Sequence, residues 1–251
     1  MYEETKQIAC KGYNAYEITY KSQGKKVVGF IVEPEGNDEK LPVIIYNRGG
    51  SNNYGIITEK DVQTKLARFA SWGYIVFASQ YHGCGGSEGK DELGGEDLYS
   101  VLDLYKIIKK HTRADEKRIG MFGISRGGLM TYMVLRKVRW VKVAAVIAGA
   151  ADLISELAYR PEMKKLNNKM FGGSKKEMIK RSAVYCANEI KTPLVLFHNK
   201  NDKKVAFLDS LFVYRRAKNA ELHAYDGKSH AIEEYEDDVY EIMRKKFSKY
   251  L

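Results

Sequence analysis

The sequence has few cysteines, and their spacing excludes the scaffolds that depend on cysteine chemistry. Only three occur among 251 residues, at Cys10, Cys84 and Cys186. An odd number of cysteines spread so widely favours neither a disulfide framework nor a zinc site. We therefore expect reduced thiols, no bound metal and no cofactor.

Long hydrophobic runs and a targeting segment are also missing. No stretch approaches the roughly 18 consecutive apolar residues of a membrane helix. The start of the chain, MYEETKQIACKG, has neither the basic region nor the apolar core of a secretory signal. These absences predict a cytoplasmic protein with no membrane association.

An excess of basic residues raises nucleic acid as a possible partner. Lysine and arginine number 42 against 32 acidic residues, which gives a formal charge of +10. Phosphate recognition needs clustered cations, yet these residues are mostly interspersed with acids and belong to no nucleic-acid-binding motif. We expect a solvated basic surface and no nucleic-acid partner.

The apolar pattern predicts one α/β domain over residues 1–251. Hydrophobic residues make up 44% of the chain, enough for a sizeable core. Tyr13–Tyr20 and Lys25–Glu33 alternate in polarity around Ser22-Gln23-Gly24, which indicates an antiparallel hairpin. Later strands are continuous apolar runs, typical of a buried parallel sheet. These strands are expected at Val43–Tyr46, Tyr74–Ala78, Arg118–Gly123, Val143–Ala148, Thr192–Phe197 and Glu221–Tyr225.

Helical patterns alternate with these strands. Right-handed crossovers between parallel strands place helices on both faces of a sheet. The prediction is a three-layer sandwich with a mostly parallel sheet of about eight strands. The helices are expected at Glu59–Ser71, Glu96–Lys110, Gly127–Lys137, Ala206–Lys218 and Ile232–Tyr250.

One segment, Ala151–Ile190, breaks the alternation and is interpreted as a small helical cap. It is rich in methionine and phenylalanine, residues that line adaptable pockets. Met163, Met170 and Phe171 are therefore candidate substrate-binding residues. The alternative is a surface insertion without such a role.

The pattern Gly-x-Ser-x-Gly, which marks a nucleophile elbow, occurs twice, around Ser87 and Ser125. An elbow needs a buried strand, a tight turn and then a helix whose amides point at the serine. Ser125 lies between an expected strand and an expected helix. Ser87 lies in a glycine-rich loop with neither, so it is interpreted as a turn serine.

A serine nucleophile also needs a base and a group that orients the base. His230 follows the last strand and is expected at the same edge of the sheet as Ser125. Asp202 follows the strand Thr192–Phe197 and is the preferred acid; Asp226, on the loop of His230 itself, is the alternative. The order serine, acid, histidine fits a Ser-Asp-His triad.

An oxyanion hole would complete this site. The expected donors are the amide of Arg126 and an amide within Asn47–Gly50, at Arg48, Gly49 or Gly50. A simple glycine turn is the alternative for that loop.

Two arginines lie at the expected mouth of the site. Free guanidinium groups of Arg48 and Arg126 could bind a substrate carboxylate through paired hydrogen bonds. The alternative is structural, with Arg126 paired to Glu88, Asp91 or Asp97.

From about Pro42 to the end, the chain resembles the catalytic domain of prolyl-oligopeptidase-like serine hydrolases, which include dipeptidyl peptidases and acylaminoacyl peptidases. The segments that carry the resemblance are Asn47–Gly50, Tyr81–Asp91, Gly123–Gly128, His198–Asp202 and Ser229-His230.

The resemblance implies the α/β-hydrolase fold, with Ser125 as nucleophile, Asp202 as acid and His230 as base. This chain has Asn199 where the family usually has glycine and Arg126 where it commonly has tyrosine. Only about forty residues precede Pro42. The propeller that carries the amine-binding glutamates of dipeptidyl peptidases is thus not expected, and aminodipeptidase specificity is not implied.

We therefore expect a serine hydrolase that cleaves esters or short acyl-peptides through an acyl-enzyme intermediate. A non-catalytic ligand-binding protein on the same scaffold is the alternative. The sequence leaves the substrate and the oligomeric state open.

Overall fold

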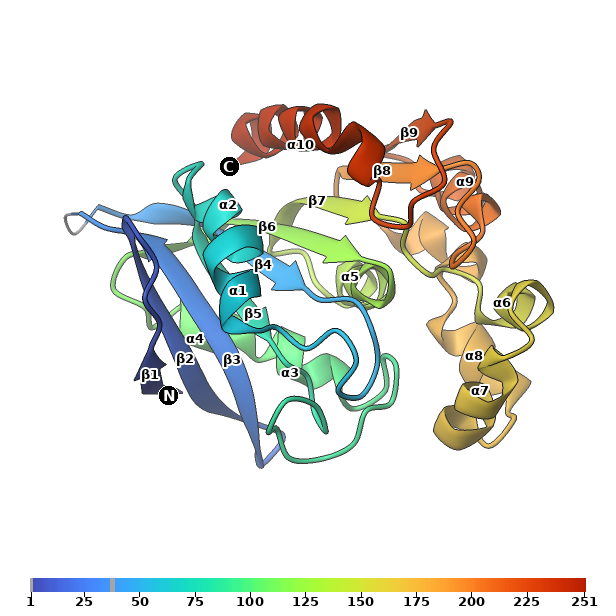
Figure 1. Ribbon diagram of the computed structural model, residues 1–251, viewed down its shortest axis with the longest axis horizontal. Coiled ribbons are helices and arrows are strands. Elements are labelled where there is room, and N and C mark those ends of the chain that lie inside the picture. Colours follow the sequence, from blue (N-terminus) through green and yellow to red (C-terminus); the bar gives the residue numbers. More distant parts are fainter. Residues whose placement is uncertain (1, 37–38) are drawn as a thin grey trace.

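A nine-stranded sheet with helices on both faces organises residues 2–36 and 39–251, which the computed structural model describes (Figure 1). In their order across the sheet, the strands are β1 (Tyr2–Gln7), β2 (Tyr13–Ser22), β3 (Lys25–Pro34), β5 (Ile75–Ser79), β4 (Leu41–Asn47), β6 (Ala114–Ile124), β7 (Val141–Ile147), β8 (Leu194–Asn199) and β9 (Ala220–Tyr225). The sheet is antiparallel from β1 to β5 and parallel from β5 to β9.

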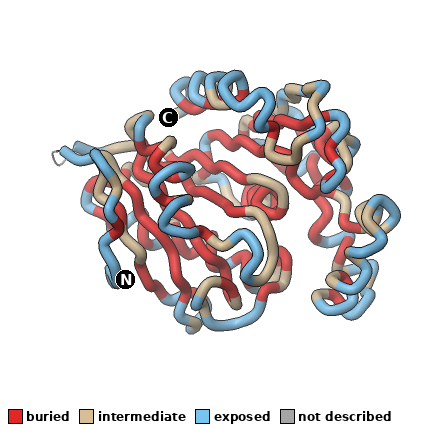
Figure 2. The backbone as a smooth tube through the Cα atoms, viewed as in Figure 1, coloured by how far each residue is buried: buried red, intermediate tan, exposed pale blue. Residues whose placement is uncertain are grey.

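The parallel strands are short apolar runs because both of their faces are covered. Val43, Ile44 and Ile45 of β4 are fully buried, as are the central residues of β8. Figure 2 shows the interior of the sheet as the most continuously buried part of the molecule. Because neither face of these strands meets solvent, their sequences do not alternate between apolar and polar residues.

Each face of the sheet has its own helical layer. Leu66, Phe69 and Phe247 pack on one face, and Leu104, Leu129 and Val213 pack on the other. The first layer contains α1 (Glu59–Asp61), a π-helical turn (Val62–Leu66), α2 (Ala67–Ala70) and α10 (Glu236–Tyr250). The second contains α3 (Leu98–Leu102), α4 (Leu104–Ile108), α5 (Arg126–Lys137) and α9 (Phe207–Arg216). The predicted three-layer α/β fold is confirmed.

The insertion predicted at residues 151–190 is helical. It contains α6 (Leu153–Tyr159), α7 (Met163–Phe171), α8 (Lys175–Arg181) and two short 3₁₀ turns at Ala183–Tyr185 and Ala187–Glu189. Figure 1 shows α6, α7 and α8 beyond the carboxyl ends of the central strands. The carboxyl ends of parallel strands are where α/β folds carry their sites, so this segment lies beside the site.

The structure departs from the sequence-based expectations at two elements. The strand β1 was not expected, because YEETKQ has no apolar alternation, and its residues are mostly exposed. The helix expected over Glu96–Lys110 is divided into α3 and α4 at Asp103, whose carboxylate accepts a hydrogen bond from Ser22 at 2.8 Å.

Two glycines allow β6 and α5 to approach each other and the loop after β4. A Cβ atom at Gly123 would lie 2.3 Å from the Gly127 carbonyl oxygen. A Cβ atom at Gly127 would lie 2.0 Å from the Asn47 carbonyl oxygen. Real Cβ atoms do not approach oxygen this closely, so any side chain at either position would force the strand, helix and loop apart.

We expect Gly127→Ala to lower the free energy of unfolding by about 3 kcal/mol, because overpacking must shift backbone rather than a side chain. Urea denaturation measures the effect. Gly172→Ala is the control: it creates no contact within 4 Å but places alanine at a φ of +57°, which costs about 1 kcal/mol. Equal losses for both variants would contradict the close packing.

Candidate active site

Ser125 lies in a strained turn between β6 and α5. Its φ of 56° and ψ of −121° lie in a region that residues other than glycine rarely adopt. The Ser125 amide donates to the Ile147 carbonyl at 2.9 Å, and its carbonyl accepts from the Gly128 amide at 2.9 Å. The neighbouring strand and helix thus hold the backbone in this conformation, and the Ser125 residue lines two cavities at the surface.

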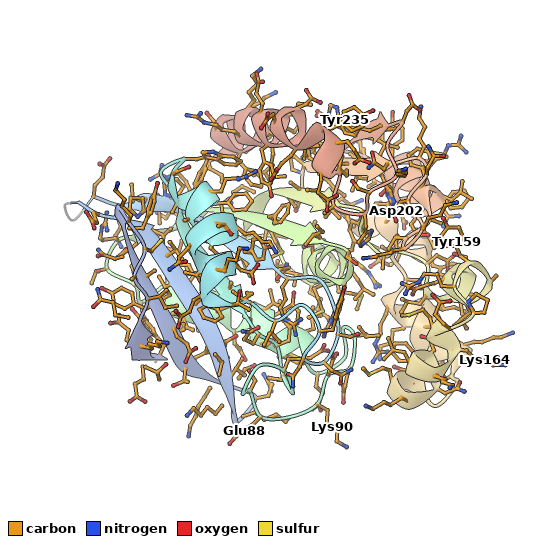
Figure 3. All side chains as sticks on the ribbon, in the orientation of Figure 1. Glu88, Lys90, Tyr159, Lys164, Asp202 and Tyr235 are labelled. Atoms are coloured by element: carbon orange, nitrogen blue, oxygen red, sulfur yellow. The ribbon has the colours of Figure 1, made fainter. Side chains whose placement is uncertain are left out.

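Ser87 has a different environment. Its hydroxyl oxygen accepts a hydrogen bond from the Val28 amide at 2.9 Å, so it ties a surface loop to β3. Figure 3 shows its neighbours Glu88 and Lys90 far from Asp202. The structure therefore does not bring Ser87 together with the other predicted site residues.

His230 and Asp202 are hydrogen-bonded. The distance from His230 Nδ1 to Asp202 Oδ2 is 2.7 Å. Because the ionised Asp202 carboxylate can only accept, Nδ1–H is the donor, and the other ring nitrogen of the neutral imidazole, Nε2, has a lone pair that can accept a proton. His230 lines both of the cavities that Ser125 lines.

Asp202 is buried and remains ionised. Burial alone would raise its pKa, but the contacts with His198 and His230 outweigh burial and hold the pKa well below its usual range. The other carboxylate oxygen, Oδ1, accepts from the amides of Lys204 and Val205 at 2.7 and 3.2 Å. The hydroxyl of Tyr159 donates to the Asp202 carbonyl, which connects α6 to this loop (Figure 3).

Asp226, the alternative acid, points away from this arrangement. Its side chain is 80% exposed and forms an ion pair with Lys200 at 2.8 Å. No contact between Asp226 and His230 is found in the described part of the chain. The geometry therefore favours Asp202 over Asp226 as the partner of His230.

Asn199, at the end of β8, holds the loop of His230. Its side-chain amide donates to the Ser229 carbonyl at 2.8 Å and to Glu234 Oε2 at 3.1 Å. The end of β8 thus restrains the residue directly before the histidine.

The glycine loop after β4 is held by its carbonyl groups. The Gly49 carbonyl accepts from Arg48 Nη1 at 2.9 Å, and the Gly50 carbonyl accepts from Arg126 Nη1 at 3.0 Å. Gly50 has a φ of +73°. Gly49 lines one of the cavities around Ser125, and Gly50 lines the other.

For Arg126, the contacts favour the structural alternative, a pair with Asp91 or Asp97, over the binding of a substrate carboxylate. Arg126 is 5% exposed, and its guanidinium pairs with Asp91 at 2.7 Å and Asp97 at 2.6 Å. Burial would lower the pKa of Arg126, but Asp97 and Asp91 outweigh burial and raise it.

The Arg48 guanidinium is likewise hydrogen-bonded within the protein. The residue is 2% exposed, and its guanidinium donates to backbone carbonyls only, including that of Gln80 at 3.0 Å. The ring of Tyr81 lies close to both guanidinium groups, 5.0 Å from that of Arg48 and 4.6 Å from that of Arg126. Neither arginine has a free guanidinium to offer a ligand.

Two cavities meet at Ser125 and His230. The cap cavity has a volume of about 410 Å³ and is bounded by α6 and α7. Its apolar wall consists of Leu93, Leu129, Ala150, Leu153, Met163, Leu166 and Val205. The α10 cavity has a volume of about 580 Å³ and lies toward the turn Val62–Leu66 and α10. Its apolar wall includes Tyr46, Ile57, Phe122, Ile124, Ile147 and Tyr240.

The structure supports one of the three candidate cap residues at the site. Met163 lines the cap cavity. Met170 and Phe171 line neither cavity; Phe171 is buried, with the Arg181 guanidinium 5.0 Å from its ring centre. Both side chains instead pack against the apolar core, and they attach α7 to the rest of the domain.

Sequence reasoning missed two residues at the cavities. Tyr54 lines both, and its position shortly after the glycine loop was an available signal. Glu156 of α6 lines the cap cavity, where burial raises its pKa to about 7 despite the nearby Arg160. No pattern in the sequence distinguishes this glutamate from others on exposed helices.

Two kinds of feature are not found in the part of the chain that the structure describes. No helix there is long and apolar enough to cross a membrane. No group of three or more histidine, cysteine, aspartate or glutamate side chains there could hold a metal ion.

Comparison with known families gives two matches. The Prolyl oligopeptidase family matches residues 60–249, which is most of the chain. The Acetyl xylan esterase family matches residues 3–99.

Individual relatives point the same way. The uncharacterized peptidase YtmA of Bacillus subtilis is 28% identical over 208 residues, which cover 81% of this chain and 79% of that protein. An acylaminoacyl peptidase structure from Pyrococcus horikoshii superposes with a TM-score of 0.83 at 24% identity, covering 96% of this chain and 42% of that one. An acetyl xylan esterase structure from Paenibacillus sp. R4 superposes with a TM-score of 0.79 at 16% identity, covering 100% of this chain and 88% of that one.

The two structural likenesses establish the α/β-hydrolase fold, and the match over residues 60–249 establishes the family. The chain therefore belongs to the prolyl oligopeptidase family, and it is a serine hydrolase.

Proposed function

We propose that this serine hydrolase cleaves esters or short acyl-peptides through an acyl-enzyme, with Ser125 as nucleophile, His230 as base and Asp202 as orienting acid. One observation carries the assignment. The strained Ser125 and the His230 imidazole line the same two cavities, and the far side of that imidazole is bonded to a buried, ionised carboxylate. We further propose that residues 1–251 act as one catalytic domain, with 151–190 as its cap.

The reaction proceeds in two halves. Ser125 Oγ attacks the acyl carbon while His230 Nε2 takes its proton, and the carbonyl oxygen becomes an oxyanion. His230 then gives that proton to the leaving oxygen or nitrogen, and the acyl group remains on Ser125. Water attacks the ester in turn, its proton passes to His230, and release of the acid returns the proton to Ser125.

The oxyanion is proposed to lie against the amide of Arg126 and an amide of the loop Arg48–Gly50. The amide of Arg126 is at the N-terminus of α5, where the helix dipole favours negative charge. The carbonyls of Gly49 and Gly50 are already occupied by guanidinium groups, which fixes the loop before substrate arrives. Preorganised donors stabilise a developing charge without having to reorient.

Tyr81 is proposed as a positioning residue for this loop. Its hydroxyl donates to the Arg48 carbonyl at 3.0 Å, directly before Gly49. Together with the two arginines, it restrains the loop.

The cap cavity is proposed to hold the acyl part of the substrate. Its apolar wall favours an uncharged acyl chain, and Met163 can adapt to chains of different shape. Both a peptidase and an esterase are among the similar proteins, and their common chemistry is acyl transfer, so we assign esters and short acyl-peptides together.

Replacement of Ser125 tests the nucleophile. Ser125→Ala is expected to lower kcat for a short-chain p-nitrophenyl ester by about a millionfold, because the acyl-enzyme cannot form. Ser87→Ala should leave kcat within a few-fold. A fluorophosphonate probe should label the wild type at Ser125 only. Loss of activity in Ser87→Ala, or a wild type that is never labelled, would reject the assignment, and the second result favours a binding protein.

Replacement of the acid tests the orientation of His230. Asp202→Asn is expected to reduce kcat by roughly three to four orders of magnitude, since the amide no longer holds the imidazole in the required tautomer. Asp226→Asn serves as the matched control and should retain nearly full activity. The kcat values of the two variants are compared by steady-state kinetics, after circular dichroism has shown that both are folded. A larger loss of kcat in Asp226→Asn than in Asp202→Asn would assign the acid to Asp226.

The positioning role of Tyr81 has its own test. Tyr81→Phe is expected to lower kcat roughly tenfold with little change in KM, because a displaced oxyanion donor affects the transition state most. Affinity for a boronic acid inhibitor should fall in parallel. Tyr20→Phe is the control: it loses two buried hydrogen bonds, to Ser79 and Ser100, away from the cavities. Similar kinetics in both variants would reduce Tyr81 to a stability role.

A further inference from the structure

The α10 cavity is a second space that opens on the nucleophile, and the cap cavity does not account for it. Both cavities include Ser125, His230 and Tyr54, so these residues stand where the two meet. Acyl transfer divides a substrate into two parts at the carbonyl carbon, the acyl group and the leaving group. A nucleophile between two cavities can therefore hold each part in its own space.

The wall of the α10 cavity is aromatic and rigid. Tyr46 of β4 and Phe122 of β6 have ring centres 5.3 Å apart. Phe69 packs behind both and also contacts Tyr240, with ring centres 6.1 Å apart. Such a surface offers flat apolar contact and edge-to-face partners for another ring.

Six charged side chains line this cavity, and four of them form two ion pairs. Asp61 pairs with Lys65 at 2.7 Å, and Arg68 pairs with Glu236 at 2.7 Å. The Arg68 guanidinium also lies 4.1 Å from the ring centre of Tyr240. The remaining two, Arg48 and Glu233, carry opposite formal charges, so the lining has no net formal charge and suits a neutral ligand better than a charged one.

The position of His230 decides which part of the substrate this cavity takes. The leaving group must receive a proton from the imidazole, so it departs on the side of the histidine loop. Ala231 and Glu233, which follow His230, line the α10 cavity and not the cap cavity. The α10 cavity is therefore on the leaving-group side.

We infer that the α10 cavity is the leaving-group subsite and that it selects neutral substrates whose alcohol or amine is aromatic. This inference rests on the proposed function, because it takes Ser125 and His230 as the reacting groups. It assigns the preferred leaving group by chemical class: a ring that packs on Tyr46, Phe122 and Tyr240, with no charge to place at the rim.

Thr64→Trp tests the subsite from its rim. Thr64 is exposed, lines the α10 cavity and lies on the π-helical turn, so a tryptophan there fills the cavity without entering the core. Gln63→Trp is the matched control, since Gln63 is also exposed but lines neither cavity. Phenyl acetate and 2-naphthyl acetate share an acyl group and have leaving groups of similar basicity, so they differ mainly in ring size.

The wild type is expected to prefer 2-naphthyl acetate by at least about fivefold in kcat/KM. Thr64→Trp should abolish this preference, and Gln63→Trp should keep it. The ratio of kcat/KM for 2-naphthyl acetate to that for 2-naphthyl hexanoate should be unchanged in both variants, because this ratio reports on the acyl side. A change in acyl-chain preference caused by Thr64→Trp, with the leaving-group preference intact, would overturn the inference.

A binding measurement separates this inference from the proposed function. The Ser125→Ala protein should bind 2-naphthol, and the fluorescence of 2-naphthol measures this binding. In the double variant Ser125→Ala/Thr64→Trp, the affinity for 2-naphthol should be at least about tenfold lower. Binding that is insensitive to Thr64→Trp would overturn the inference. Binding that depends on Thr64 in a protein whose wild type hydrolyses none of the esters would support the cavity and count against the proposed function.

Discussion

The buried ion cluster of Arg126, Asp91 and Asp97 joins the parts of the site that must not move relative to one another. Arg126 directly follows Ser125, while the two aspartates come from the long segment between β5 and α3. The same guanidinium reaches the Gly50 carbonyl. Removing one partner of a buried ion pair typically costs about 3–5 kcal/mol, so this cluster couples the turn at Ser125 and the glycine loop to the stability of the fold.

Sequence reasoning found the elements whose signal is local. The buried strands are continuous apolar runs, and Ser125 was separated from Ser87 by the strand and helix around it. Asp202 and His230 follow predicted strands, and the structure brings them within 2.7 Å. The ion pairing of Arg126 was available from the sequence only as an alternative with three possible acids, and the contacts of Arg48 were not predicted. The aspartates that hold Arg126 lie 35 and 29 residues away in the sequence, and no pattern shows which of several acids a buried arginine contacts. The apolar wall of the α10 cavity likewise comes from five separated segments.

The likeness to both peptidases and esterases follows from how the site is divided. The turn at Ser125, Asp202 and His230 are held by the sheet and by contacts such as that of the Asn199 side chain with the loop of His230. The walls of the two cavities come in part from residues 151–190, the loop after β4 and α10. One framework can therefore be combined with different cavity walls, which is how one fold serves different acyl-transfer substrates.

The edge strand β1 carries a consequence for how the protein behaves at high concentration. A sheet that ends in an open strand offers unpaired backbone groups to any second strand, and this is a common route to aggregation. Here the outermost strand is YEETKQ, whose charged and polar side chains are mostly exposed. Desolvating those charges disfavours strand-to-strand association. The lack of apolar character that hid β1 from sequence analysis thus helps to protect the open edge of the sheet from intermolecular pairing.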